Sequence, residues 1–115
     1  MRASSILSKK SCLPCKKASP PMRGSTIQLM LNKLGGDWQA VNEHHLRKEY
    51  AFKDFIEALH FVNLVAEVSE RESHHPSVEL SWGKAVITIY SHVIDGLSES
   101  DFILAAKCDD LYDQS

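Results

Sequence analysis

The 115-residue chain has no long apolar run. The longest, AVITI at residues 85–89, has the length of a strand, whereas a membrane-spanning helix needs about 20 apolar residues. The first residues also lack the apolar stretch of a secretory signal peptide. We therefore expect a single domain, located in the cytoplasm, with no membrane partner.

Acidic residues are absent from residues 1–23, which carry six bases. Because this segment is short, contains prolines and shows no amphipathic stripe, we interpret residues 1–24 as a flexible basic tail rather than an organelle transit peptide, and residues 25–115 as the folded domain. Residues 24–115 hold seven bases against fifteen acids, a net charge of −8. We expect no nucleic-acid partner, because a duplex requires a positive protein face.

Cysteine is scarce, and its odd count of three argues against a secreted scaffold built on disulfides. Cys12 and Cys15 have the CxxC spacing of half a zinc site or of a redox pair. A redox motif normally follows a strand, and no strand is predicted before these cysteines. A structural zinc site needs a second pair of ligands, which Cys108 alone does not supply. We expect Cys12 and Cys15 to be reduced, exposed and uninvolved in catalysis.

Hydrophobic periodicity predicts three helices and two β-hairpins. The predicted helices lie within residues 24–36, 53–72 and 97–112, and the strands within residues 37–41, 46–52, 78–82 and 85–92. The order is therefore α-β-β-α-β-β-α. Hairpins interleaved with helices indicate an α+β fold with a four-stranded antiparallel sheet and three helices.

The predicted helix at residues 53–72 is apolar over most of its circumference, since its polar side chains occupy one narrow strip. One sheet covers only one side of a helix, which leaves side chains such as Phe55, Leu59 and Val62 to be covered by something else. A second subunit would do so, and we expect a homodimer or homotetramer. The alternative is that the first helix covers this side within one chain.

Two doubled histidines stand out. His44 and His45 fall between the first two predicted strands, where we expect them to be solvated at a hairpin tip without a catalytic partner. His74 and His75 instead precede Pro76, which restricts the backbone of the residue before it. Glu70 lies one helical turn before the second pair.

His92 lies at the end of the last predicted strand, on the same face as Tyr90, and the hairpin could return it toward residues 74–75. Trp82 and Tyr90 add aromatic surface. Three histidines, a carboxylate and aromatic walls are typical of acid–base catalysis on a planar heterocycle. A zinc site and purely structural histidines are the alternatives, although no HExxH-like ligand spacing occurs.

Taken together, these residues resemble the signature of the pterin-4a-carbinolamine dehydratases. Glu70, HHP at residues 74–76, Trp82, His92 and Asp101 follow one another with gaps of three, five, nine and eight residues. The phrases FKDF, WGK and GLSESDFILAA also resemble that family, and the resemblance spans residues 25–113.

The resemblance implies a hydro-lyase that converts 4a-hydroxytetrahydrobiopterin to quinonoid dihydropterin and water, with no cofactor and no metal. By the same resemblance all three histidines would be catalytic: His74 and His92 would transfer protons, and His75 would orient the pterin and stabilise the electron-poor C4a centre. Glu70 and Asp101 would orient imidazoles or contact the pterin, and Trp82 would pack on it. Asp101 could instead be a charge at a helix N-terminus, and Trp82 could pack only on the sheet.

The resemblance further implies symmetric dimers or tetramers and coupling to an aromatic amino acid hydroxylase, whose pterin product this reaction recycles. Two other functions stay open. Some animal relatives act as dimerisation cofactors of a homeodomain transcription factor, and a molybdopterin-linked role would use related chemistry. Loss of the histidines would abolish an enzymatic activity but would leave a binding role intact.

Overall fold

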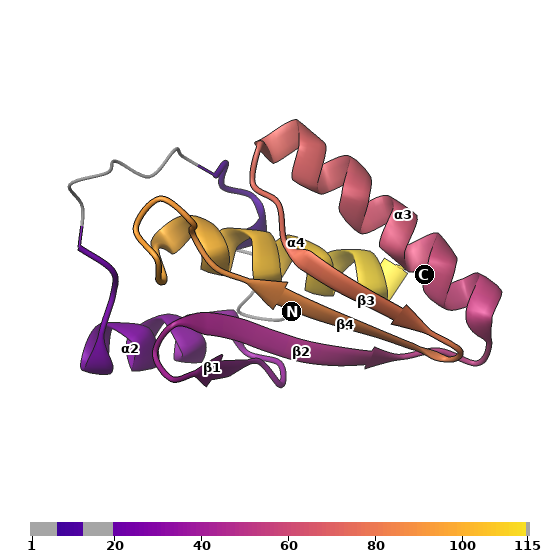
Figure 1. Ribbon diagram of the computed structural model, residues 1–115, viewed down its shortest axis with the longest axis horizontal. Coiled ribbons are helices and arrows are strands. Elements are labelled where there is room, and N and C mark those ends of the chain that lie inside the picture. Colours follow the sequence, from indigo (N-terminus) through magenta and orange to yellow (C-terminus); the bar gives the residue numbers. More distant parts are fainter. Residues whose placement is uncertain (1–6, 13–19, 115) are drawn as a thin grey trace.

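A computed structural model describes residues 7–12 and 20–114 of the chain. One face of a four-stranded antiparallel sheet is covered by helices, with α4 lying between α2 and α3 (Figure 1). The helices are α2 (Gly24–Leu34), α3 (Phe55–Glu72) and α4 (Glu99–Gln114). Their order with the strands is α-β-β-α-β-β-α, which confirms the predicted α+β fold.

The sheet has the strand order β1-β2-β4-β3, so that the second strand of each hairpin lies in the centre. Every second residue of a strand points to the same face of the sheet. On the face that the helices cover, Leu46, Ile87 and Ile89 of the central strands are fully buried. No helix of the described part is long and apolar enough to cross a membrane. The strands are β1 (Gln39–Val41), β2 (His45–Ala51), β3 (Ser77–Ser81) and β4 (Lys84–Ile89).

Helix α3 begins after Asp54, whose carboxylate accepts a hydrogen bond of 2.9 Å from the backbone N–H of Glu57. One side of α3 is buried against the sheet and α4. Leu59 and Val62, which we expected to lack cover within one chain, are half-buried. Exposed large apolar side chains on α3 are confined to its first turn, where Phe55 is 41% and Ile56 70% exposed.

Strand β4 ends at Ile89, three residues earlier than the sequence predicted. The chain turns back because Ser91 pairs with Gly96 and Asp95 takes a left-handed conformation with φ 51°. The prediction that His92 belongs to the last strand is therefore wrong. His92 lies in this turn, residues 91–96, just past the end of the sheet.

Residues 7–12, which fall within the predicted flexible tail, pack on the folded domain. Leu7 is 2% exposed and belongs to the hydrophobic core, and Lys107 of α4 donates a hydrogen bond of 2.7 Å to the carbonyl of Ser8. Part of this basic segment therefore has a defined place beside α4. The backbone N–H of Met22 also donates a hydrogen bond of 2.8 Å to the carbonyl of Leu97. Residues 1–6 and 13–19, which include Cys15, lie outside the described residues, and their flexibility stays a prediction.

Candidate active site

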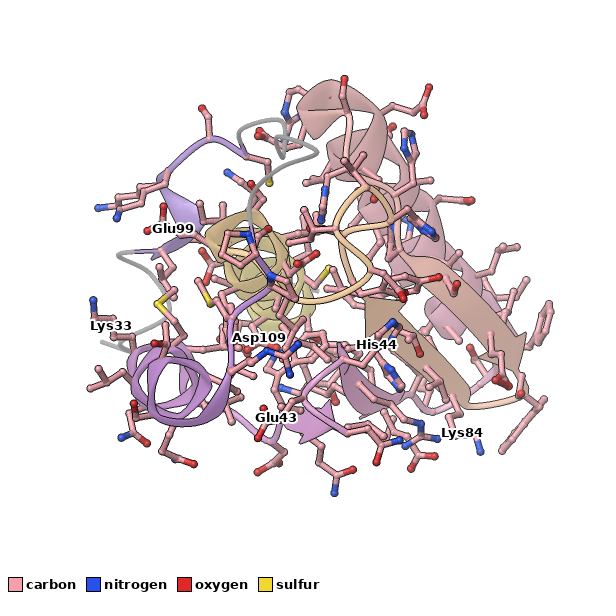
Figure 2. The ribbon with its side chains drawn as sticks, turned by 60° about the vertical axis from the view of Figure 1, so that its left-hand side comes forward. Lys33, Glu43, His44, Lys84, Glu99 and Asp109 are labelled. Atoms are coloured by element: carbon pink, nitrogen blue, oxygen red, sulfur yellow. The ribbon has the colours of Figure 1, made fainter. Side chains whose placement is uncertain are left out.

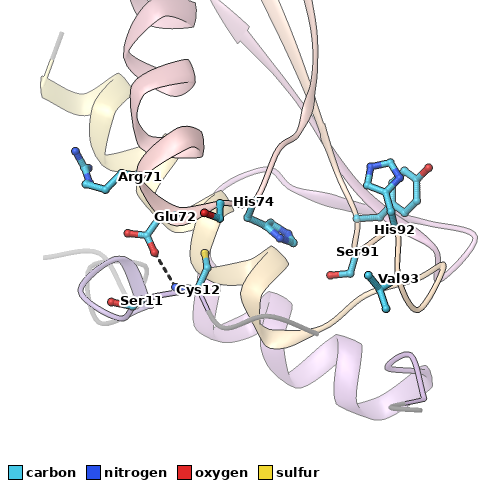
Figure 3. A pocket seen from close by; sticks show the side chains of 10 residues that line it. Ser11, Cys12, Arg71, Glu72, His74, Ser91, His92 and Val93 are labelled. Atoms are coloured by element: carbon cyan, nitrogen blue, oxygen red, sulfur yellow. Dashed lines mark hydrogen bonds between the residues drawn. The ribbon is translucent and has the colours of Figure 1, made fainter. Parts of the chain in front are cut away.

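A cavity of about 800 Å³ opens where the end of α3, the turn after β4 and the N-terminal segment meet (Figure 3). Such a volume suits a small heterocyclic ligand. His74 and His92 both line the cavity, His74 from the α3–β3 connection and His92 from the turn. The lining also includes Ser11, Cys12, Arg71, Glu72, Ser73, Tyr90, Ser91 and Val93.

The end of α3 sets the direction of His74. Ser73 adopts a left-handed conformation with φ 53°, and the N–H of His74 donates to the carbonyl of Ser69 at 3.1 Å. Pro76 follows two residues later and favours extended backbone before it. The local sequence thus ends the helix and fixes the backbone from which the His74 side chain projects.

His74 is bound to a buried carboxylate. Its Nε2 lies 2.6 Å from Oδ1 of Asp101, and the two side chains are 15% and 0% exposed. Because a carboxylate only accepts hydrogen bonds, His74 carries a proton on Nε2 when Asp101 is ionised. The other ring nitrogen, Nδ1, is then the one available for proton transfer.

The second oxygen of Asp101 is held from the opposite side. Oδ2 accepts hydrogen bonds of 2.8 Å from the backbone N–H of Ser98 and 2.8 Å from the hydroxyl of Ser91. The N–H of Asp101 in turn donates to the carbonyl of Ser98 at 3.1 Å, which completes a capping arrangement at the start of α4. One oxygen of Asp101 thus contacts an imidazole and the other lies at the N-terminus of α4, which are the two placements considered from the sequence.

His92 is held differently from His74. Its ring packs on Tyr90 at a tilt of 45° with centroids 4.3 Å apart, and within residues 7–12 and 20–114 its side chain makes no hydrogen bond. Figure 3 shows His74 and His92 approaching the cavity from different chain segments. The structure thus brings together two of the predicted histidines and Asp101, but only His74 has a buried acid partner.

The remaining predicted site residues lie outside the cavity lining. Nε2 of His75 contacts Oε2 of Glu70, and both side chains are largely exposed. Trp82 is 73% exposed in the β3–β4 turn, at the opposite end of the hairpin from His92, so the fold of one chain does not bring it to the cavity. Among the described residues, no three His, Cys, Asp or Glu side chains come together as a set of metal ligands.

Cys12 is part of the cavity wall and is half-buried, so the prediction of an exposed thiol is wrong for this residue. Its N–H donates to Oε1 of Glu72 at 2.8 Å (Figure 3). Its thiol donates to the carbonyl of Ser100 at 3.5 Å. Burial and the charge of Glu72 raise the pKa of this thiol to about 12, so it stays protonated near neutral pH. The CxxC spacing was visible in the sequence, but no sequence signal connected it to the cavity.

The first histidine pair also differs from the prediction of a solvated tip. Asn42 and Glu43 form a tight turn with positive φ, but the side chains of His44 and His45 are half-buried. Nε2 of His44 lies 2.8 Å from Oδ1 of Asp95. Burial, then the neighbouring His44 and Arg47, lower the pKa of His45.

Comparison with known proteins gives a consistent result. A family model described as pterin 4 alpha carbinolamine dehydratase matches residues 20–111. A Rubrobacter xylanophilus protein is 49% identical over 107 residues, covering 93% of this chain and 99% of its own, and an Alkaliphilus metalliredigens protein is 47% identical over 103 residues, covering 90% and 93%. The names of both assign them to the pterin-4-alpha-carbinolamine dehydratases. The crystal structure of a transcriptional coactivator/pterin dehydratase from Brucella melitensis matches with a TM-score of 0.74 and 27% identity, covering 79% of this chain and 97% of that one.

Proposed function

Since the chain belongs to the pterin 4 alpha carbinolamine dehydratase family, we propose that it converts 4a-hydroxytetrahydrobiopterin to quinonoid dihydropterin and water. The reaction breaks the C4a–O bond, and the hydroxyl leaves with the bonding electron pair and one proton, as water. A ring N–H loses its proton, and the electrons of that bond form the new C=N double bond to C4a. No net oxidation or reduction occurs.

The observation that carries this proposal is the buried His74–Asp101 pair at a cavity that His92 also lines. With its Nε2 proton held by Asp101, His74 accepts the ring N–H proton at Nδ1, and the ionised Asp101 stabilises the imidazolium that forms. His92 donates the proton that hydroxide needs to leave, since hydroxide itself is a poor leaving group. Imidazole can both accept and donate a proton, which suits both tasks.

His75 and Glu70 are assigned to orienting the pterin at the mouth of the site. Their exposed contact next to His74 supports this assignment. Trp82 contacts the substrate only if another subunit brings it to the cavity. A metal-free and cofactor-free mechanism stays a prediction, which chelator treatment followed by metal analysis tests.

The direct test is a stopped-flow assay on freshly prepared 4a-hydroxytetrahydropterin, with protein whose fold is checked by circular dichroism. We expect catalysis without any added cofactor. His74→Ala and His92→Ala should each lower kcat by about 10²–10⁴-fold, the usual contribution of a positioned acid or base. His60→Ala is the matched control, because His60 is an exposed histidine of α3 outside the cavity lining. A rate no higher than the uncatalysed background in folded wild-type protein would disprove the proposal.

We also propose that the chain forms a homodimer or homotetramer. Exposed Phe55 and Ile56 on α3, together with Val78 on the edge strand β3, support this because they leave apolar surface at the molecular boundary. Sedimentation at micromolar concentration tests it, and a monomer near 12.9 kDa would contradict it. Coupling to an aromatic amino acid hydroxylase and a cytoplasmic location stay predictions.

A further inference from the structure

The turn at residues 91–96 carries His92, whose backbone carbonyl accepts a hydrogen bond of 3.3 Å from the N–H of Asp95. Ser91 and Gly96 close the turn through backbone hydrogen bonds of 2.8 and 3.3 Å. The Ser91 side chain is buried and bound to Asp101, whereas the opposite side of the turn, at Val93 and Asp95, is exposed. The ring of His92 packs on the ring of Tyr90, with centroids 4.3 Å apart.

His44 contacts residues on both sides of His92. Its ring packs on Tyr90 with centroids 4.6 Å apart, and its Nε2 lies 2.8 Å from Oδ1 of Asp95. Tyr90 precedes His92 by two residues and Asp95 follows it by three. One side chain from the β1–β2 turn thus fixes both flanks of the segment that presents His92.

The contact between the rings of His44 and His45 is compatible with the hydrogen bond from His44 to Asp95. Nδ1 of His44 lies 3.1 Å from Nδ1 of His45, so one of these two nitrogens must carry a proton and the other must accept. In either case Nε2 of His44 carries a proton, because the Asp95 carboxylate can only accept. A neutral His44 that donates to Asp95 from Nε2 therefore accepts at Nδ1 from Nδ1 of His45, whereas a His44 that donates from both nitrogens is the doubly protonated imidazolium.

We propose that His44 and Asp95 are positioning residues, which hold Tyr90 and the turn so that His92 faces the cavity in the geometry needed for proton transfer. This inference rests on the proposed function, in which His92 donates the proton to the leaving hydroxyl. Neither residue touches the cavity, whose lining contains Tyr90 and His92 but not His44 or Asp95. Their effect should therefore fall on kcat rather than on substrate binding.

The test compares His44→Ala, Asp95→Ala and the double variant with wild type in the same stopped-flow assay. Each single variant should lower kcat about 10-fold, since small displacements of a catalytic group are costly, and KM should change by less than about two-fold. The double variant should be no slower than the slower single variant, because both remove the same contact. Asp95→Asn keeps an acceptor oxygen for His44 and should restore most of kcat.

His44→Phe separates the two contacts, because it keeps a ring against Tyr90 but cannot donate to Asp95. An intermediate kcat is expected if both contacts position the turn. The matched control is Glu43→Ala, a change of the neighbouring exposed residue in the same β1–β2 turn, which should behave as wild type. A kcat within about two-fold of wild type for both His44→Ala and Asp95→Ala would overturn the inference.

A second measurement does not require activity. In isotope-labelled protein the His92 ring resonances should shift and broaden in His44→Ala and in Asp95→Ala, while those of His74 should stay in place. Unchanged His92 resonances would overturn the positioning role whatever the turnover. Inactive wild-type protein with the expected resonance changes would instead disprove the proposed function and leave the positioning of His92 established.

Discussion

Asp101 and Asp109 lie on the same helix, α4, and are 0% and 1% exposed, but their surroundings differ. Asp101 binds the imidazole of His74 at the wall of a cavity. Asp109 lies between α4 and the sheet (Figure 2), where it accepts hydrogen bonds from three side chains. These come from the ammonium of Lys48 at 2.8 Å, the hydroxyl of Tyr50 at 2.6 Å and the indole N–H of Trp38 at 3.1 Å.

From this comparison we expect the partner of a buried carboxylate to decide whether it takes part in catalysis. Lys48 offers only donors and no lone pair, so its contact with Asp109 is a fixed ion pair that ties α4 to β2. His74 can gain and lose a proton at a nitrogen other than the one that Asp101 holds. The first aspartate is therefore expected to affect turnover and the second to affect stability.

The largest effect is expected from Asp109→Ala. It leaves the nearly buried Lys48 charge without its counterion and removes the acceptor of Tyr50 and Trp38, so the free energy of unfolding should fall by about 3–5 kcal/mol. Urea titration measures this change, and kcat per folded molecule should stay within about two-fold of wild type.

Glu99→Ala is the matched control on the same helix. Glu99 forms an exposed ion pair with Lys10 at 3.4 Å, and such pairs contribute less than about 1 kcal/mol. If Asp109→Ala lowered kcat as strongly as a change at Asp101, the distinction between the two aspartates would be lost.

Asp101→Asn should affect kcat more strongly than the free energy of unfolding. An amide presents one acceptor and one donor side, so it cannot accept from both His74 and the Ser98 N–H. We expect kcat to fall about 10²-fold and the free energy of unfolding by about 1–3 kcal/mol. Stopped-flow kinetics and urea titration on the same preparation measure both. A large loss of stability with unchanged kcat would assign Asp101 to the fold alone.

The smallest effect concerns the thiols near the two aspartates. The pKa of the Cys12 thiol is raised to about 12 by burial first and then by acids that include Glu72 and Asp101, and the pKa of Cys108 is raised by burial and by Asp109. A thiol that ionises only in the unfolded chain favours unfolding as pH rises, so stability should fall above pH about 9, the unperturbed value.

Urea titrations between pH 7 and 10 measure this dependence. The variant with both Cys12 and Cys108 replaced by Ala should lose less stability over the interval from pH 9 to 10 than wild type does. Equal slopes for the two proteins would show that neither thiol is protected from ionisation by the fold.

Local patterns were enough to predict the order of helices and strands, since apolar periodicity depends only on neighbouring residues. The same is true of the placement of Asp101 near a helix N-terminus. The fixed gaps from Glu70 to Asp101 also led to His74 and His92, which the fold places at one cavity. The sequence by itself was therefore sufficient to predict the order of the elements and two histidines of the cavity.

Only the tertiary structure decided which side chains meet over long sequence separations. Asp109 and Lys48, Cys12 and Glu72, and His44 and Asp95 each come together from more than fifty residues apart along the chain. Periodicity carries no information about such pairs, because they depend on sheet register and on how helices pack across it. For the same reason the sequence misplaced Cys12, expected His44 to be solvated and could not show that Trp82 lies away from the cavity.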